Sequence, residues 1–215
     1  MGTRYLAASW QGLVQYVVYL VSRGYYFYHI TYFPLKKKDK FAEIDRKLIG
    51  KYKADLSKFQ RYRRKAKGLA NFVYVRWHNI AIILHTLGEI EEGIVYDDQF
   101  HDIRERPLEI KVSDLTALVI RIIDGRVTVR LSRETYEGLR IVLYETAKTK
   151  DKQLMLNEFR KIDAFPSWAG IFEQKQNLAR YLVKQARRNE VKLTLGEVHI
   201  TRKRTPVQVF AEQEI

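Results

Sequence analysis

The segment ALVIRIIDGRVTVRLS, residues 117–132, carries the clearest turn signal in the chain. Its Asp124-Gly125 pair separates two runs in which apolar and polar residues alternate, a pattern typical of a two-residue β-hairpin. Alternation gives this hairpin an apolar face made of Leu118, Ile120, Ile122, Val127, Val129 and Leu131. The other face holds Val119, Arg121, Ile123, Arg126, Thr128 and Arg130. The segment therefore predicts antiparallel β structure with one cationic face.

A further hairpin is predicted upstream, in residues 72–85 around His78-Asn79. Pairing across that turn gives it an apolar face made of Val73, Val75, Trp77, Ile80, Ile82 and Leu84. Residues 25–33 are rich in aromatics and end at Pro34, which predicts another strand. Because both faces of that strand are aromatic, we expect it to be central in the sheet and covered on both sides.

The other segments have helical periodicity. Apolar spacing predicts helices over residues 6–21, residues 41–52 and residues 55–68, with Gly24 as the stop signal of the first. Three more helices are predicted after residue 132, and Pro166 opens the longest of them. Residues 89–107 are predicted to be a loop, with a short strand near residues 108–112 and a last strand in the tail from Val191.

This order of elements predicts an α+β fold, an antiparallel ferredoxin-like sheet with helices packed on one face. We expect residues 1–132 to form the sheet domain. Residues 133–215 are predicted to form a C-terminal helical layer packed on that domain, in one compact unit.

The charge of the chain points to a polyanionic partner. Lys and Arg number 39 against 25 Asp and Glu, which gives a formal net charge of +14 over 215 residues. Such an excess destabilises a compact state through self-repulsion, and nucleic acid is the partner that most often compensates for it. An anionic membrane surface and plain solubility are the alternatives.

The absence of cysteine excludes disulfides, thiolate metal sites and a cysteine nucleophile. The most apolar window, residues 6–21, is too short and too polar to span a membrane and lacks the features of a signal peptide. We therefore expect a cytoplasmic protein that does not associate with membranes.

The sequence YHIT at residues 28–31, followed by a helix and by a hairpin with Asn79 at its turn, resembles the HUH single-strand transposases. Within that family the likeness is to the REP-associated tyrosine transposases, and it covers residues 25–86. The resemblance implies an HUH-like sheet in which two histidines bind a divalent metal and a helix tyrosine attacks a DNA phosphate. Ile80 and Ile82 stand where those histidines are expected, and isoleucine has no lone pair to offer a metal. The resemblance therefore implies a binding surface without the nuclease centre.

The predicted nucleic-acid contacts come from three basic groups. The segment KFQRYRRKAKG, residues 58–68, combines cations that attract phosphates with an aromatic that can stack on an unpaired base. Its predicted contact residues are Lys58, Arg61, Tyr62, Arg63, Arg64, Lys65 and Lys67. The second group is the basic turn with Lys36, Lys37 and Lys38. The third is the cationic hairpin face with Arg121, Arg126 and Arg130. For each group the alternative is a solvated, charged surface.

Two sites could instead carry chemistry. His29 could be a metal ligand, but one histidine is too few for a catalytic metal, so we favour a strand histidine hydrogen-bonded on a partly covered face. Residues 85–102 hold several carboxylates and two histidines, which could bind magnesium or form a flexible solvent loop. The loop is favoured because no known ligand spacing is present.

The sequence thus favours a non-catalytic nucleic-acid-binding protein, with no cofactor and no metal, related to mobile or plasmid elements. One alternative is a metal-dependent nuclease that acts on single-stranded or hairpin DNA. Another is an RNA-binding subunit of a larger ribonucleoprotein.

Overall fold

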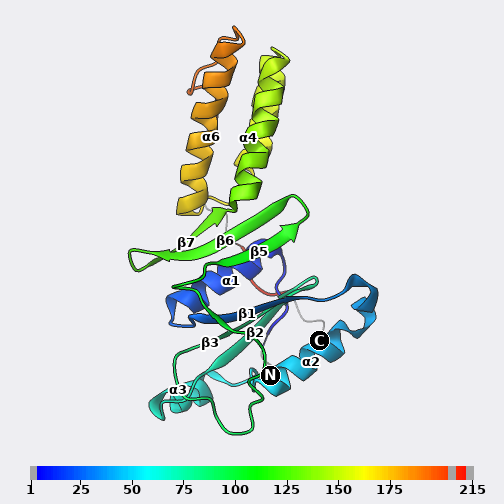
Figure 1. Cartoon of the computed structure of the whole chain (residues 1–215), viewed down its shortest axis with the longest axis vertical. Coiled ribbons are helices and arrows are strands. Elements are labelled where there is room, and N and C mark those ends of the chain that lie inside the picture. Colours follow the sequence, from blue (N-terminus) through cyan, green and yellow to red (C-terminus); the bar gives the residue numbers. More distant parts are fainter. Residues whose placement is uncertain (1–3, 203–206, 212–215) are drawn as a thin grey trace. The chain divides into compact units, whose positions relative to one another are not determined.

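The computed structural model describes residues 4–202 and 207–211 and confirms the α+β class (Figure 1). The first half contains α1 (Trp10–Ser22), β1 (Phe27–Tyr32), the 3-10 helix η1 (Leu35–Lys40), α2 (Phe41–Lys51), α3 (Lys58–Ala66), β2 (Phe72–Trp77) and β3 (Ile80–His85). The second half contains β4 (His101–Asp102), β5 (Leu108–Ser113), β6 (Thr116–Ile123), β7 (Arg126–Leu131), α4 (Arg133–Lys148), α5 (Lys152–Asp163) and α6 (Ala169–Arg188). No helix in the described part of the chain has the length and apolar character needed to cross a bilayer.

Contacts between residues divide the chain into two compact units. The first contains residues up to 108 together with residues 121–127 and 207–211, and the second contains residues 109–120 and 128–202. The boundary between them passes through β6 and β7, so this hairpin has residues in both units. The predicted boundary after residue 132, and the packing of the helical layer on the sheet domain, stay predictions.

The first unit contains a four-stranded sheet in the order β2-β3-β1-β4. The predicted upstream hairpin forms β2 and β3, with Val73 opposite Leu84 and Trp77 opposite Ile80. All six residues of β3 are buried, because β3 has a neighbour on each side and is covered on both faces. The expectation that the aromatic strand is covered on both faces is wrong: β1 lies between β3 and β4, yet only Tyr28 of its six residues is buried.

A buried ion pair joins α2 to this sheet. Asp45 of α2 is fully buried and accepts hydrogen bonds from the Tyr74 hydroxyl at 2.5 Å and from Arg76 Nε and Nη2 at 2.7 and 2.8 Å. Burial and this carboxylate raise the pKa of Tyr74, so its hydroxyl stays protonated. Each polar atom thus has a partner, which a charge without access to solvent requires.

The hairpin of residues 117–132 forms β6 and β7 in a separate three-stranded sheet, in the order β5-β6-β7. Asp124 and Gly125 have φ of +49° and +72°, the left-handed conformation that this two-residue turn needs. Leu118, Ile120, Val129 and Leu131 are buried, whereas Arg121 and Arg126 are exposed, so the alternation predicts the faces correctly. The two predicted hairpins nevertheless belong to different sheets.

Helix starts shift from the predicted positions because capping side chains set them. The first helix begins at Trp10, since the Ser9 hydroxyl accepts a hydrogen bond from the Gly12 amide. The third begins at Lys58, after Ser57, which forms a capping box with Gln60.

The helices α4, α5 and α6 pack together in the second unit and form a core of their own (Figure 1). Its buried members are Leu143, Ala147, Met155, Phe159, Ile162, Leu178, Ala179, Leu182, Ala186, Leu193 and Val198. The last strand predicted from Val191 does not form within the described residues 191–202, and Lys203 and Arg204 lie outside the described part.

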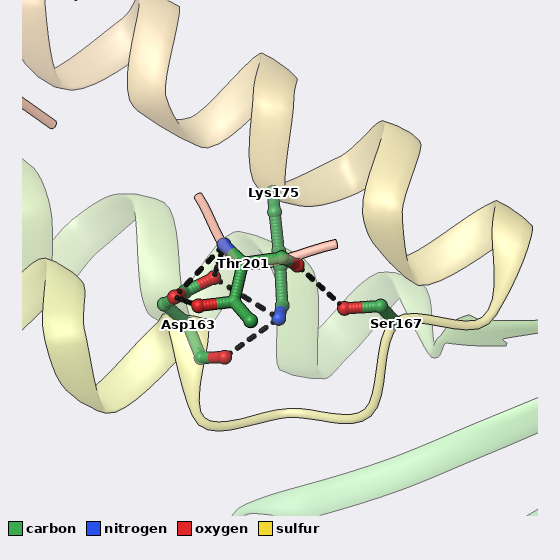
Figure 2. A network of polar contacts seen from close by, with 4 residues as sticks. All are labelled: Asp163, Ser167, Lys175 and Thr201. Carbon is green, nitrogen blue, oxygen red and sulfur yellow. Dashed lines mark hydrogen bonds and ion pairs between the residues drawn. The ribbon is translucent and has the colours of Figure 1, made fainter. Parts of the chain in front are cut away.

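A polar network ties the segment after α6 to the end of α5 (Figure 2). The Asp163 carboxylate accepts hydrogen bonds from the Thr201 amide and from the Thr201 hydroxyl at 2.6 Å. The fully buried Lys175 donates to the Asp163 carbonyl at 2.6 Å and lies 3.2 Å from its carboxylate, and the Ser167 hydroxyl donates to the Thr201 carbonyl. These bonds fix a segment that has no regular secondary structure.

Candidate nucleic-acid interface

The helix α3 is held on the first unit by one of its own arginines. Arg64 is buried, pairs with Glu91 at 2.5 Å and donates from Nη2 to the Ala70 carbonyl at 3.0 Å. The Asn71 side chain donates to the Arg61 carbonyl, which fixes the helix from the same side. Arg64 was predicted to contact phosphates, but it is an internal anchor and we exclude it from the interface.

The rest of α3 projects away from this anchor. Phe59 and Tyr62 are 77% and 74% exposed, although they are large apolar side chains. They lie three residues apart and therefore on one side of the helix. Together with the neighbouring cations they form what we call the α3 surface: Lys58, Phe59, Arg61, Tyr62, Arg63, Lys65 and Lys67. Arg61 is half-buried, and the other six are exposed.

Other parts of the first unit also hold arginine side chains against aromatic rings. Burial raises the pKa of the Tyr16 and Tyr25 phenols, and the positive charge of Arg61 opposes this rise. In the same unit, the guanidinium of Arg23 lies 5.3 Å from the centre of the Tyr19 ring. The guanidinium of Arg104 lies 4.7 Å from the centre of the Tyr26 ring. Such contacts between arginine and aromatic faces are those that also accept stacked bases.

The sequence does not predict these arginine–aromatic contacts. The aromatic strand of residues 25–33 is expected to be covered, and Arg23 and Arg104 stand outside any basic run. The run of aromatic residues after Gly24 could have indicated exposed rings. When a strand is covered on one face only, about half of its side chains stay at the surface.

The lysines of η1 lie at the opposite end of the four-stranded sheet. Phe27 and Phe72 both pair with His85 at the end near α3, whereas Tyr32 and Trp77 both pair with Ile80 at the other end. Leu35 begins η1 three residues after Tyr32, so its exposed lysines are separated from α3 by a six-residue strand, about 20 Å. The structure therefore does not bring the first two predicted basic groups together (Figure 1).

The three predicted contact arginines of the β6–β7 hairpin differ in exposure. Arg121 and Arg126 are exposed. Arg130 pairs with Glu173 of α6 at 3.5 Å, and the start of α6 packs so closely on this strand that a Cβ added to Gly170 would lie 2.5 Å from the Arg130 side chain. Arg130 is thus partly covered by a helix.

Four acidic residues of the 85–102 region form ion pairs. Glu91 binds Lys53 and Arg64, Asp97 and Asp98 bind Lys51, and Asp102 binds Arg104. Hydrogen bonds from Lys53 and Arg64 lower the pKa of Glu91 to about 2. Within residues 4–202 and 207–211, no three His, Asp or Glu side chains are grouped so that they could hold a metal ion. These ion pairs tie the segment to Lys51 of α2, to Lys53 and to Arg64 of α3.

The histidines of this unit are held by backbone and aromatic contacts. The half-exposed His29 has its Nδ1 3.0 Å from the Gln99 carbonyl, which confirms a hydrogen-bonded histidine on a partly covered sheet face. His85 is buried between the rings of Phe27 and Phe72, and its Nε2 is 3.0 Å from the Tyr96 hydroxyl. Burial lowers the pKa of His85, which keeps the ring neutral.

Ile80 and Ile82, at which the resemblance to HUH transposases would place metal-binding histidines, are aliphatic and inaccessible. Ile80 is 2% exposed and Ile82 is fully buried in β3. Comparison of the chain with protein-family models, with curated proteins and with solved structures finds no match. The resemblance to HUH transposases therefore stays a prediction from the sequence.

Proposed function

We propose that this protein binds nucleic acid without cleaving it, through the α3 surface. The observation that carries the proposal is the pair of exposed aromatic side chains, Phe59 and Tyr62, among five cations on one firmly anchored helix. If α3 were only a charged helix in contact with solvent, two large exposed aromatic rings on one side of it would not be expected.

The two kinds of side chain have separate tasks. The cations neutralise phosphates and release counterions, which makes binding strong at low salt and weak at high salt. The aromatic rings stack on unpaired bases, and each stacked base contributes about 1–3 kcal/mol with little sequence preference. The anchor through Arg64 keeps the helix in place, so little order has to be gained on binding.

We do not propose catalysis, because three acidic side chains of the 85–102 region already have cationic partners. Glu91, Asp98 and Asp102 each accept hydrogen bonds from lysine or arginine. A carboxylate that is bound in this way is a poor ligand for a further cation.

Fluorescence anisotropy with labelled single-stranded DNA, duplex DNA and RNA tests the proposal. With five phosphate contacts on a single strand, the slope of log affinity against log salt is expected to be about −3.5. Replacing Lys58, Arg63 and Lys65 together by glutamate should abolish measurable binding at moderate salt.

The matched control replaces Lys36, Lys37 and Lys38 by glutamate. It changes the net charge by the same amount, at exposed positions about 20 Å from α3, which exceeds the Debye length of about 8 Å at physiological salt. Affinity of this control is expected to stay close to wild type. Equal losses in both variants would contradict the α3 surface, and weak, salt-independent binding to all three probes would contradict nucleic-acid binding itself.

A further inference from the structure

One side of α1 carries a column of stacked side chains. The rings of Tyr16 and Tyr19 are stacked, with their centres 6.2 Å apart and an angle of 15° between their planes. The guanidinium of Arg23 lies 5.3 Å from the centre of the Tyr19 ring. The three residues follow one another at spacings of three and four, so they lie on one side of the helix. We call Tyr16, Tyr19 and Arg23 the α1 column.

The α1 column is supported at one end and open at the other. Tyr16 is half-buried, and its ring meets the Phe210 ring edge-on with the centres 4.8 Å apart. Tyr19 is 49% exposed and Arg23 is exposed, so the column ends in solvent at its guanidinium. The helix dipole explains an arginine at the C-terminus of a helix, but it does not explain the exposed ring beneath that arginine.

The charge of Arg23 is free to attract a phosphate. In the described part of the chain no carboxylate forms an ion pair with Arg23, and Asp39 is the first acidic residue of the sequence. The guanidinium of Arg104, which also lies over a tyrosine ring, is instead bound by the Asp102 carboxylate at 2.5 Å. A guanidinium plane that is not bound by a carboxylate can stack on a base and attract the phosphate next to it.

The open end of the α1 column and the α3 surface lie at the same end of the four-stranded sheet. The Asn71 side chain, directly before β2, donates to a carbonyl of α3. Gly24 ends α1 three residues before Phe27, and Phe27 and Phe72 both pair with His85. The end of α1 and the helix α3 are accordingly found on the same side of this sheet in Figure 1, opposite η1.

We infer that the ligand of the α3 surface is an unpaired strand that continues to the α1 column, where a further base stacks on Arg23. The inference rests on the proposed nucleic-acid binding and adds the class of nucleic acid and its path. Bases of an unpaired strand can fill two separate stacking positions. Bases of a duplex are already paired and stacked, and each would first have to be flipped out at a cost in free energy. A duplex is therefore expected to bind through its phosphates alone, and more weakly.

Fluorescence anisotropy of the full chain with single-stranded oligonucleotides of about 4 to about 16 nucleotides tests the inference. Wild-type affinity should rise with length and level off once both positions are filled. Tyr19→Ala/Arg23→Ala should bind the shortest oligonucleotides with nearly wild-type affinity, and the long ones about tenfold to hundredfold more weakly. Annealing a complementary strand to the long oligonucleotides should remove the gain in affinity that comes with length.

The matched control is Tyr144→Ala/Lys148→Ala in α4. Lys148 Nζ lies 4.4 Å from the centre of the Tyr144 ring, and the two residues have the same spacing in sequence as Tyr19 and Arg23. The control thus removes a similar pair and the same charge from a different helix, and it should bind like the wild type at every length. Circular dichroism verifies that both variants are folded, which is expected because the changed side chains are at the surface.

Three results would overturn the inference. In the first, Tyr19→Ala/Arg23→Ala binds long oligonucleotides as tightly as the wild type. In the second, the duplex keeps the full gain with length, and in the third, wild-type affinity does not change with length, a result that needs no variant to fold. In each case, loss of binding on replacing Lys58, Arg63 and Lys65 by glutamate would still support the α3 surface. Absence of binding to every probe would overturn both this inference and the proposed function.

Discussion

Removal of the Asp163 carboxylate is expected to destabilise the protein through the lysine that it leaves behind. Lys175 is fully buried, and in Asp163→Ala its only described hydrogen-bond acceptor would be the backbone carbonyl of residue 163. Breaking a buried pair by removal of one partner costs about 3–5 kcal/mol, because the other charge stays buried without compensation. With a urea slope of about 2–3 kcal/mol per molar, the unfolding midpoint should fall by about 1–2 M.

A double mutant separates this effect from the loss of ordinary contacts. Lys175→Met keeps most of the buried aliphatic volume and removes the charge, while Asp163 retains its hydrogen bonds from Thr201. The double variant Asp163→Ala/Lys175→Met should therefore be more stable than Asp163→Ala by about 1–4 kcal/mol. Urea unfolding at neutral pH, followed by circular dichroism, gives the four free energies of the cycle.

Two results would refute this reasoning. A double variant no more stable than Asp163→Ala would show that the buried charge is not the source of the loss. Additive effects of the two substitutions would show that the side chains are not coupled, despite the 3.2 Å between them.

The remaining predictions concern the other buried pair, the anchor of α3 and a glycine of α4. Asp45→Ala should lower the free energy of unfolding by about 3–5 kcal/mol in urea, because it leaves the largely buried Arg76 without a counter-charge; a near-neutral effect would contradict this. The pKa of Glu91 is lowered to about 2, so its stabilising contribution is present above its ordinary pKa near 4.5 and is lost as pH falls toward 2. Unfolding measured from pH 6 to pH 2 should depend less on pH in Glu91→Gln, and an unchanged profile would contradict the pairing. Gly138→Ala should raise the free energy of unfolding by about 1 kcal/mol in urea, because an added Cβ meets nothing within 4 Å and alanine favours a helix interior; a loss of stability would contradict this.

Local patterns were enough to predict most of the elements of this fold, but not η1 or β4, and the strand predicted from Val191 does not form in residues 191–202. Asp124-Gly125 defines its turn because those residues tolerate positive φ. Residues 72–77 and 80–85 form the predicted strands because both are short runs rich in β-branched and aromatic residues on either side of a two-residue turn. The placement of the two hairpins in different sheets could not be predicted. Sheet order depends on contacts between residues far apart in sequence, and both hairpins have an equally apolar face.

The residues of the candidate site could also be predicted only in part. The basic run in residues 58–68 predicted a cationic helix, but the run gave no sign that Arg64 points inward while its neighbours point outward. That difference comes from Glu91, which is 27 residues further along the chain. The acidic loop was open to interpretation for the same reason, since its partners Lys51, Lys53 and Arg64 are brought to it only by the fold.

Photo-crosslinking of a bound single-stranded oligonucleotide, followed by mass spectrometry of the crosslinked peptides, tests the central claim most directly. Because aromatic side chains that stack on bases are well placed to crosslink, the account predicts that the crosslinks map to Phe59 and Tyr62. Phe59→Ala/Tyr62→Ala should lose these crosslinks and remain folded, since both side chains are at the surface. Crosslinks that map to η1 or to the hairpin of β6 and β7, with none in α3, would contradict the claim.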